Sequence, residues 1–314
     1  MRAAVLHAPG DLRVEEVPVP DDGEVLVRVE ASTCCGTDRK ALLHGHRILG
    51  PYPCRFGHET AGVREDTGER VLVGDSVACG ACAPCRAGRA QLCREVRWVV
   101  GGFAQWIAAP EAALHAVPRG LDAVGAAMAE PLAAAVHAVG RAYDSRAAAA
   151  AVVGGGTMGL MVARLLALGG RAVTVADPHA ERREQALALG AAAASPALDP
   201  ARFGLVFEAV GRPEAWRDAL AAAAPGGMVV LVGGCPGGTD VALPAAPLHY
   251  DEVDLRGAFH HDRGEVDAAL ALLAAGRVDW RALAGETVGL DRLAERLLAP
   301  ARGPACKLVV DPWG

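Results

Sequence analysis

Four cysteines follow one another at the spacing of a metal site. They form the pattern C-x2-C-x2-C-x7-C and are Cys79, Cys82, Cys85 and Cys93. Glycine and proline in the same stretch let a short loop curl around one ion, and four thiolates at about 2.3 Å complete the tetrahedral shell of Zn²⁺ with no position left for water. We therefore expect a structural zinc. An iron–sulfur cluster is the competing interpretation, but the last spacing differs from ferredoxin runs and no proline follows Cys93.

A second group of metal-binding side chains lies upstream, with Cys35 in the segment Cys-Gly-Thr-Asp and the pair His58 and Glu59 after a proline-rich loop. A thiolate, an imidazole and a carboxylate together make an open zinc site, in which a fourth position stays free for water or substrate. Taken alone the signal is weak, because single cysteines and histidines mostly occupy core or surface positions. The cysteine loop and the motif described next favour the metal site.

A glycine-rich turn provides the third chemical signal. The segment from Gly154 to Gly159 has the G-x-G-x-x-G pattern between an apolar strand at 151–153 and a predicted helix at 160–168, and a further strand leads to Asp177. In such a unit the glycines and the amides of the helix N-terminus receive a pyrophosphate, and the acid binds the adenosine ribose. A carboxylate at Asp177 repels a 2′-phosphate, so we expect NAD rather than NADP. Arg182 and Arg183 leave NADP open. The predicted cofactor-binding residues are Gly154, Gly156, Thr157, Met158, Gly159, Asp177 and Arg182.

Two kinds of secondary structure must position these residues. β-branched runs between turn residues predict strands in the N-terminal third, at 3–6, 24–29 and 70–73. From about Glu130, strands at 151–153, 172–175, 205–207 and 229–232 alternate with alanine-rich helical segments. This alternation predicts a doubly wound parallel sheet with right-handed crossovers. Helices at 265–275 and 291–298 and a closing strand at 307–310 complete the chain. The expected fold class is α/β, with a second, mostly β domain.

Composition narrows the choice of function. The chain has 314 residues, which predicts about two domains, and its net charge of −6 disfavours nucleic acid and anionic membranes as partners. The first residues contain no apolar segment of the secretory type, and no uninterrupted apolar run reaches the length of a membrane span. We expect a cytoplasmic protein, in which the nine cysteines stay reduced.

The order of Cys35, His58, cysteine loop and glycine turn resembles that of the zinc-containing medium-chain alcohol and polyol dehydrogenases. Gly101-Gly-Phe-Ala, Glu130-Pro and the terminal Lys307-Leu-Val-Val add to the resemblance, and Glu130-Pro is similar to the sorbitol and threonine dehydrogenase branch. It implies a GroES-like catalytic domain over 1–127 that carries the structural-zinc lobe and is completed by 259–314, and a Rossmann domain over 128–258. It also implies a homodimer or homotetramer.

The resemblance further implies one catalytic and one structural zinc per chain. The catalytic ion is held by Cys35 and His58 with either Glu59 or Glu130, and Thr37 passes the substrate proton outward. Lys40 stands where many alcohol dehydrogenases have a relay histidine, so the proton path differs here. The implied reaction is reversible hydride transfer between a secondary alcohol (a polyol, amino alcohol or sugar-like compound) and NAD.

Two alternatives remain at this stage: a zinc-free enzyme of the quinone-reductase type, and a non-catalytic nucleotide-binding protein. The intact ligand set argues against both. A basic segment between Asp38 and Glu59, with Arg39, Lys40 and Arg47 and no acidic residue, predicts a polar or anionic substrate if it borders the cleft.

Overall fold

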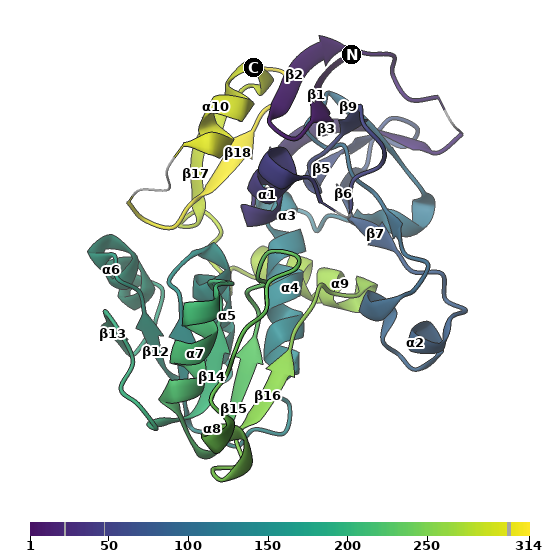
Figure 1. The fold of residues 1–314 in the computed structure, drawn as a ribbon. Helices are drawn as coiled ribbons and strands as arrows, with labels where there is room; N and C mark the ends of the chain where they lie inside the picture. Colours follow the sequence, from purple (N-terminus) through teal and green to yellow (C-terminus); the bar gives the residue numbers. More distant parts are fainter. Residues whose placement is uncertain (22, 47, 300–302) are drawn as a thin grey trace. The chain divides into compact units, whose positions relative to one another are not determined.

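The structure is a computed structural model that describes residues 1–21, 23–46, 48–299 and 303–314 (Figure 1). In it the chain forms two compact units. One contains Met1–Pro131 and most of the chain after Asp262, and the other contains Leu132–His261. We describe each by itself.

The second unit is built on a six-stranded sheet in which every pair of neighbouring strands is parallel. Its strands are β11 (Ala149–Val153), β12 (Ala172–Ala176), β13 (Ala193–Ser195), β14 (Phe203–Glu208), β15 (Ala223–Leu231) and β16 (Asp254–Gly257). They lie in the order β13-β12-β11-β14-β15-β16. Counted from β11, this is the order 3-2-1-4-5-6 of the Rossmann fold, whose crevice opens where the order reverses, between β11 and β14.

Helices connect these parallel strands, since a parallel pair cannot be joined by a tight hairpin. They are α5 (Thr157–Leu168), α6 (Ala180–Ala188), α7 (Pro213–Ala222) and α8 (Ala245–His249), and α4 (Ala129–Gly140) precedes the first strand. Both faces of the inner strands are covered, so Val152, Val206 and Val229 are completely buried. Leu166 of α5 and Leu220 of α7 are buried as well, which explains the apolar stripe on each helix.

The first unit is mostly β. Its larger sheet has the order β10-β6-β5-β3-β18-β17, with β9 also paired to β3, and a three-stranded sheet has the order β2-β1-β4. The strands are β1 (Arg2–Ala8), β2 (Asp11–Glu16), β3 (Val25–Thr33), β4 (Cys54–Arg55), β5 (Glu59–Arg64), β6 (Arg70–Val73), β9 (Trp106–Ala109), β10 (Leu114–Ala116), β17 (Ala284–Val288) and β18 (Lys307–Val310). Its longer helices are α1 (Gly36–His44), α3 (Ala123–Ala127), α9 (Arg263–Ala274) and α10 (Leu293–Leu298), and η2 (Glu111–Ala113) and η3 (Leu290–Arg292) are single 3-10 turns.

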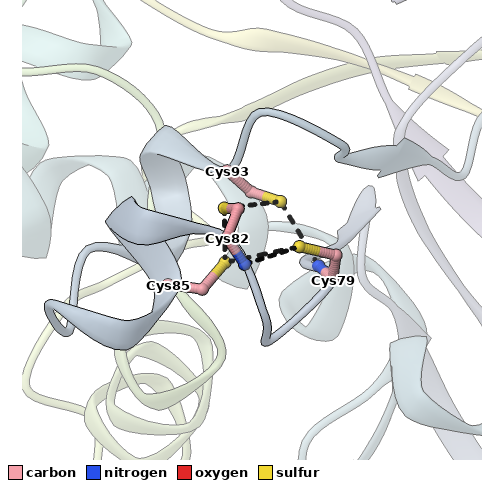
Figure 2. Close-up of side chains that lie close together, drawn as sticks. All are labelled: Cys79, Cys82, Cys85 and Cys93. Atoms are coloured by element: carbon pink, nitrogen blue, oxygen red, sulfur yellow. Dashed lines mark hydrogen bonds between the residues drawn. The ribbon is translucent and has the colours of Figure 1, made fainter.

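A small lobe leaves this unit between two short paired strands, β7 (Ser76–Val77) and β8 (Arg97–Trp98). It contains only one short helix, α2 (Ala83–Arg86), and the 3-10 turn η1 (Ala90–Leu92). No side chain of α2 or η1 is buried. The four cysteine side chains of the lobe point toward one another (Figure 2). With no apolar core of its own, such a lobe needs another source of stability.

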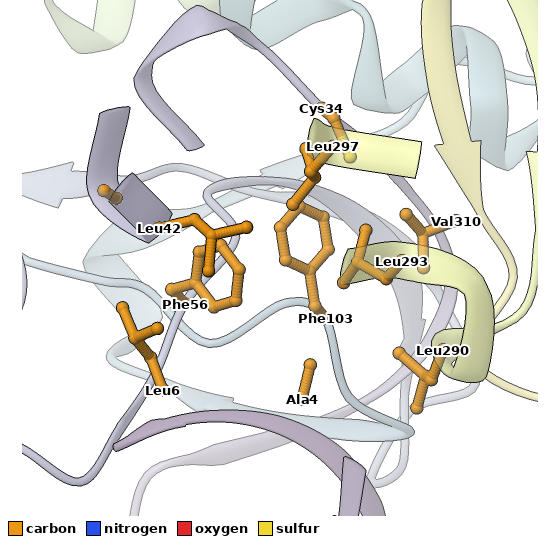
Figure 3. Close-up of a cluster of buried hydrophobic side chains, with 11 residues drawn as sticks. Ala4, Leu6, Cys34, Leu42, Phe56, Phe103, Leu290, Leu293, Leu297 and Val310 are labelled. Atoms are coloured by element: carbon orange, nitrogen blue, oxygen red, sulfur yellow. The ribbon is translucent and has the colours of Figure 1, made fainter. Parts of the chain in front are cut away.

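An apolar cluster fixes the end of β3 beside α1 (Figure 3). Phe56 and Phe103 meet edge to face with ring centroids 5.0 Å apart, and Cys34 and Leu42 belong to the same cluster. Gly57 has a φ of +92°, and a Cβ there would lie 2.7 Å from the Phe103 ring, so only glycine fits before His58. Cys34 behaves as a small apolar residue, and the next residue, Cys35, begins α1.

The predicted fold class, a Rossmann sheet with a mostly β GroES-like domain, is confirmed. The predicted strands and helices all correspond to observed elements. The edge strands β13 and β16 of the Rossmann sheet escaped prediction, and so did most strands of the first unit, including β2, β5, β9 and β17. One helical stretch, Ala123–Gly140, is long and apolar enough to cross a membrane by length and composition, and 67% of it is buried inside the structure. A buried core helix passes the same test, and this one contains the acidic Glu130.

Candidate functional site

The four cysteines of the lobe lie at the distances that a tetrahedral zinc requires. Sγ of Cys82 is 3.4 Å from Sγ of Cys85 and 3.9 Å from Sγ of Cys93, and Sγ of Cys79 is 4.0 Å from Sγ of Cys85 (Figure 2). With Zn–S bonds of about 2.3 Å, the edge of a regular tetrahedron is about 3.8 Å. The sulfur positions therefore fit one zinc ion.

Backbone amides prepare the same sulfur atoms for the charge of a thiolate. The amides of Cys79 and Glu95 donate to Cys93 Sγ at 3.3 and 3.4 Å, and the amide of Cys82 donates to Cys79 Sγ at 3.3 Å. Amides of Arg94 and Cys85 lower the pKa of Cys82 to about 6, whereas desolvation and the bond to Cys82 raise the pKa of Cys85 to about 12. Of these two thiols Cys82 therefore ionises first, and a bound dication would drive the deprotonation of Cys85.

Cys35 and His58 form the centre of the second cluster. Cys35 is the N-cap of α1, and its Sγ accepts a hydrogen bond from the Thr37 amide at 3.2 Å. The same Sγ lies 3.4 Å from His58 Nε2. A thiolate and an imidazole on one tetrahedral zinc are about 3.5 Å apart, so the two side chains fit a common ion.

Asp38 orients both of these side chains. It is 1% exposed, its Oδ2 accepts from the Cys35 amide at 2.8 Å, and its Oδ1 lies 3.1 Å from His58 Nδ1. The second contact has ion-pair distance without the angle of an N–H hydrogen bond. A carboxylate behind a metal-binding imidazole fixes the ring and raises its basicity. The capping pattern Cys-x-x-Asp is the sequence signal that could have predicted this role of Asp38.

Two further carboxylates lie near His58: Glu59, the next residue in the chain, and Glu130 from the start of α4. His58, Glu59 and Glu130 each offer a ligand atom, and these atoms lie within 4.8 Å of one another. Glu59 is 1% exposed and both of its oxygens are engaged: Oε1 accepts from Lys307 Nζ at 2.7 Å, and Oε2 accepts from the Thr33 hydroxyl. Sequence reasoning missed the role of Lys307, which belongs to β18 and is separated from Glu59 by most of the chain.

The electrostatics of this cluster follow from its burial. Burial by itself lowers the pKa of His58, but Asp38 and Cys35 outweigh it and raise that pKa well above its usual value. Burial raises the pKa of Cys35, and it raises the pKa of Glu59 against the opposing charge of Lys307. The Cys35 thiol, the His58 imidazole and the Glu59 carboxylate thus hold their protons more firmly than in water. A bound zinc reverses this balance, so metal binding here releases protons.

The remaining residues of this region lie on α1. Thr37 is half-buried next to Cys35, and Arg39, Lys40 and His44 are exposed on the same helix. Arg47 lies outside the described residues.

The glycine-rich turn has the geometry of a phosphate site. Gly154 has a φ of +100°, and a Cβ on Gly159 would overlap the Gly154 carbonyl oxygen, so both positions require glycine. Gly156 is the N-cap of α5, carries no capping side chain and faces open space. Thr157 and Met158 begin the helix, so the first amides of α5 stay available for a phosphate group.

Asp177 follows β12 and is 3% exposed. Its Oδ2 accepts from the Gly155 amide and its Oδ1 from the His179 amide, both at 2.9 Å. Arg182 Nη1 lies 3.5 Å from Asp177 Oδ2. The predicted acid thus stands at the glycine turn, with a cation beside it.

Comparisons with known proteins match both units of the chain to the same family of proteins. Residues 21–119 match the alcohol dehydrogenase GroES-like domain, and residues 155–275 match the zinc-binding dehydrogenase domain. A zinc-type alcohol dehydrogenase-like protein of Haemophilus influenzae is 30% identical over 89% of each chain. Sorbitol dehydrogenase of Bacillus subtilis is 29% identical over 95% of this chain and 92% of its own. A structure from Sinorhizobium meliloti, described as a zinc-binding dehydrogenase bound to NADP, is 30% identical, covers 99% of both chains and superposes with a TM-score of 0.91.

The Rossmann sheet, the GroES-like unit and two sets of zinc-binding side chains define a zinc-dependent nicotinamide dehydrogenase. The chain belongs to the family of zinc-type medium-chain alcohol dehydrogenases. It is an oxidoreductase that transfers a hydride between a secondary alcohol and a nicotinamide dinucleotide, with zinc as its metal. The family favours the zinc-dependent dehydrogenase over the zinc-free reductase and the non-catalytic protein that the sequence alone had left open.

Proposed function

We propose that the substrate is a polyhydroxylated secondary alcohol, either a polyol or the corresponding sugar acid. The observation that carries the proposal is the buried cluster around His58, in which carboxylates and not a second cysteine accompany Cys35. Relatives support it. They include sorbitol dehydrogenase of Bacillus subtilis and L-galactonate-5-dehydrogenase of Escherichia coli, which is 29% identical over 88% of each chain.

In this proposal the catalytic zinc is held by Cys35 and His58 with Glu59 or Glu130, and the structural zinc by Cys79, Cys82, Cys85 and Cys93. When bound, the catalytic zinc supplies a Lewis acid that makes the substrate hydroxyl more acidic, and the dinucleotide supplies the hydride acceptor. Asp38 fixes the orientation of the His58 ring and accepts a hydrogen bond from the Cys35 amide. Thr37 carries the substrate proton toward solvent, and its position one residue from the exposed end of α1 supports this role.

The hydrogen bonds that Lys307 and Thr33 donate to Glu59 favour Glu130 as the zinc ligand in the resting enzyme. Lys307 and Thr33 already donate hydrogen bonds to both oxygens of Glu59, and Glu130 offers a ligand atom within 4.8 Å of those of His58 and Glu59. Glu59 then serves as a nearby negative charge that offsets the dication, and it replaces Glu130 only when its two bonds break.

We also propose the division into a catalytic domain, 1–127 completed by 259–314, and a dinucleotide domain, 128–258. The two compact units support this division. The assembly is proposed to be a homodimer or homotetramer in the cytoplasm, where reducing conditions keep the five cysteines of the two proposed zinc sites free of disulfides.

NAD is the proposed cofactor because the Asp177 carboxylate repels a 2′-phosphate. Arg182 partly neutralises that charge, so the preference should be modest, about tenfold in kcat/KM. Replacement Asp177→Ala should raise KM for NAD and bring the NAD/NADP ratio close to one. An unchanged ratio would show that Asp177 does not face the ribose.

Metal analysis and a substrate panel test the proposal together. Two zinc ions per chain and NADH formation from polyols or sugar acids are expected. One zinc ion would remove one of the two proposed sites, and none would remove both. Activity confined to simple alcohols would overturn the substrate class.

The exposed cations of α1 bear on the choice between polyol and sugar acid. If they orient an anionic substrate, Lys40→Gln should raise KM for a sugar acid several-fold and leave KM for the neutral polyol unchanged. The control is Arg119→Gln, which removes an exposed positive charge elsewhere in the same unit. Equal effects on both substrates would show that the cations of α1 do not determine substrate specificity.

A further inference from the structure

Glu208 is a completely buried carboxylate that the proposed chemistry does not use. It is the last residue of β14, one of the two strands between which the order of the Rossmann sheet reverses, and it is 0% exposed. Burial raises the pKa of Glu208, and the amides of Gly211 and Val210 oppose that rise. Because burying a carboxylate costs stability, the groups that it bonds indicate what it is for.

The side chain and the main chain of Glu208 fix two different turns. Its Oε1 accepts from the amides of Val210 and Gly211 at 2.7 and 2.8 Å, in the turn after β14. Its carbonyl oxygen accepts from the amides of Val232 and Gly233 at 2.8 and 2.9 Å, in the turn after β15. One residue therefore holds both turns at the carboxyl end of the sheet.

The two turns also contact each other with no room for side chains. A Cβ on Gly233 would lie 2.7 Å from Gly211 Cα and 2.8 Å from Glu208 Oε2. Gly211 itself has a φ of +75°, and Trp216 Nε1 donates to the Gly233 carbonyl at 3.1 Å. The two turns are therefore packed directly against each other.

The turn after β14 in turn contacts the glycine-rich turn. A Cβ on Gly154 would lie 2.6 Å from Val210 Cγ2 and 3.4 Å from the Ala209 carbonyl carbon. The Ala209 amide donates to the Val153 carbonyl at 2.9 Å, which ties the start of this turn to β11. Displacement of 209–211 would therefore disturb the segment that receives the pyrophosphate.

We propose that Glu208 is a positioning residue for dinucleotide binding, which holds the 209–211 and 232–233 turns so that they flank the glycine-rich turn before the cofactor arrives. Preorganisation of this kind raises affinity because no ordering of the loops has to accompany binding. Val210, 39% exposed, then presents a fixed apolar side chain beside Gly154. The inference rests on the proposed cofactor role of the glycine-rich turn.

The test compares Glu208→Ala with Glu208→Gln in the zinc-loaded full chain. Alanine leaves the amides of Val210 and Gly211 without their acceptor, so the Kd for NADH, measured by fluorescence titration, should rise at least about tenfold. Glutamine keeps a carbonyl oxygen for the same amides, and a rise of only about two- to threefold is expected. Hydrogen exchange of a peptide that covers 209–211 should accelerate in the alanine variant, with zinc content unchanged.

Two controls separate positioning from general destabilisation. Val173→Ala removes buried volume from β12 in the same unit and should lower the melting temperature with little change in the Kd for NADH. Glu214→Gln removes an exposed carboxylate, 73% exposed, and should change neither. If Glu208→Ala does not fold, the glutamine variant and its exchange rate at 209–211 decide.

The outcomes distinguish this inference from the proposed function. If the wild-type protein binds no NADH, the proposed function fails. If the wild-type protein binds NADH and Glu208→Ala binds it equally well, Glu208 has no positioning role. The same conclusion follows if Val173→Ala weakens binding as much as Glu208→Ala at an equal loss of melting temperature.

Discussion

The two groups of candidate zinc ligands differ in how the chain assembles them. The lobe draws all four ligands from Cys79 to Cys93, is largely exposed, and has no apolar core. The cluster around His58 draws its residues from the start of α1, the start of β5 and the start of α4, and is supported by Lys307 from β18. The first can form as soon as its loop exists, whereas the second requires a finished sheet.

The difference also concerns charge. In the lobe, backbone amides donate hydrogen bonds to the sulfur atoms. The surrounding water screens the thiolate charge that these bonds do not offset. In the cluster, every ionisable group is buried beside another one, so each depends on its neighbours. Loss of zinc from the lobe should therefore disturb the lobe alone. In the cluster, loss of any single partner should disturb the remaining groups as well.

The largest expected effect is that of Cys35→Ser on catalysis. Serine still caps α1, because it is a favoured N-cap residue, but it binds zinc far more weakly than a thiolate does. We expect kcat/KM to fall at least about 1000-fold, or about 4 kcal/mol, and zinc content to fall from two ions to one. Steady-state rates and elemental analysis check this. Retention of both ions with near-normal rates would show that Cys35 is not a ligand.

Lys307→Met should cause the largest loss of stability in the cluster. It leaves the Glu59 carboxylate buried without its cation, which costs about 3 kcal/mol of unfolding free energy in urea denaturation. Lys307→Arg should recover part of that loss. As a control, Arg97→Met breaks a partly exposed ion pair to Glu24 and should change stability by less than about 1 kcal/mol. Equal losses in both variants would contradict the contrast between the regions.

Cys82→Ser should unfold the lobe and leave the cluster intact. The lobe loses its zinc, and we expect a loss on the order of 2 kcal/mol in unfolding free energy, with a lower melting temperature. Hydrogen exchange should accelerate in 79–93 and stay unchanged around His58. Turnover should fall less than about tenfold once the remaining site is loaded. Unchanged zinc content would show that Cys82 is not a zinc ligand in the lobe.

The smallest effect is expected for Thr33→Val, which keeps the shape of the side chain and removes its hydroxyl from Glu59. Loss of a hydrogen bond to a charged group should cost about 1.5 kcal/mol. Thr67→Val serves as the control: it removes an exposed hydroxyl that accepts a hydrogen bond from the Glu69 amide at 3.3 Å, and it should cost less than about 0.5 kcal/mol because water can replace that bond. No difference between the two variants would mean that the Thr33 hydroxyl does not hold Glu59.

How far the sequence predicts each region depends on the separation of its residues. The cysteine lobe and the glycine turn could be predicted from spacing, because all their essential residues are close in the chain. His58 and Glu59 gained meaning only from the order of the motifs. Lys307 could not be assigned a role, since its partner is set by the pairing of β18 with β3. Glu208 lacked a signal of its own: an acid after an apolar strand usually faces solvent, and here it bonds two turns.

The insertion of β18 beside β3 has a consequence for how the protein is made. Lys307 follows Glu59 by 248 residues, which takes a ribosome roughly 12 to 50 s at about 5 to 20 residues per second. Throughout that interval Glu59 has no Lys307 beside it and the larger sheet lacks β18, whereas Leu132–His261 is synthesised completely before the interval ends. The nascent chain should therefore complete its dinucleotide unit first, and the catalytic unit, although it begins the chain, should close last.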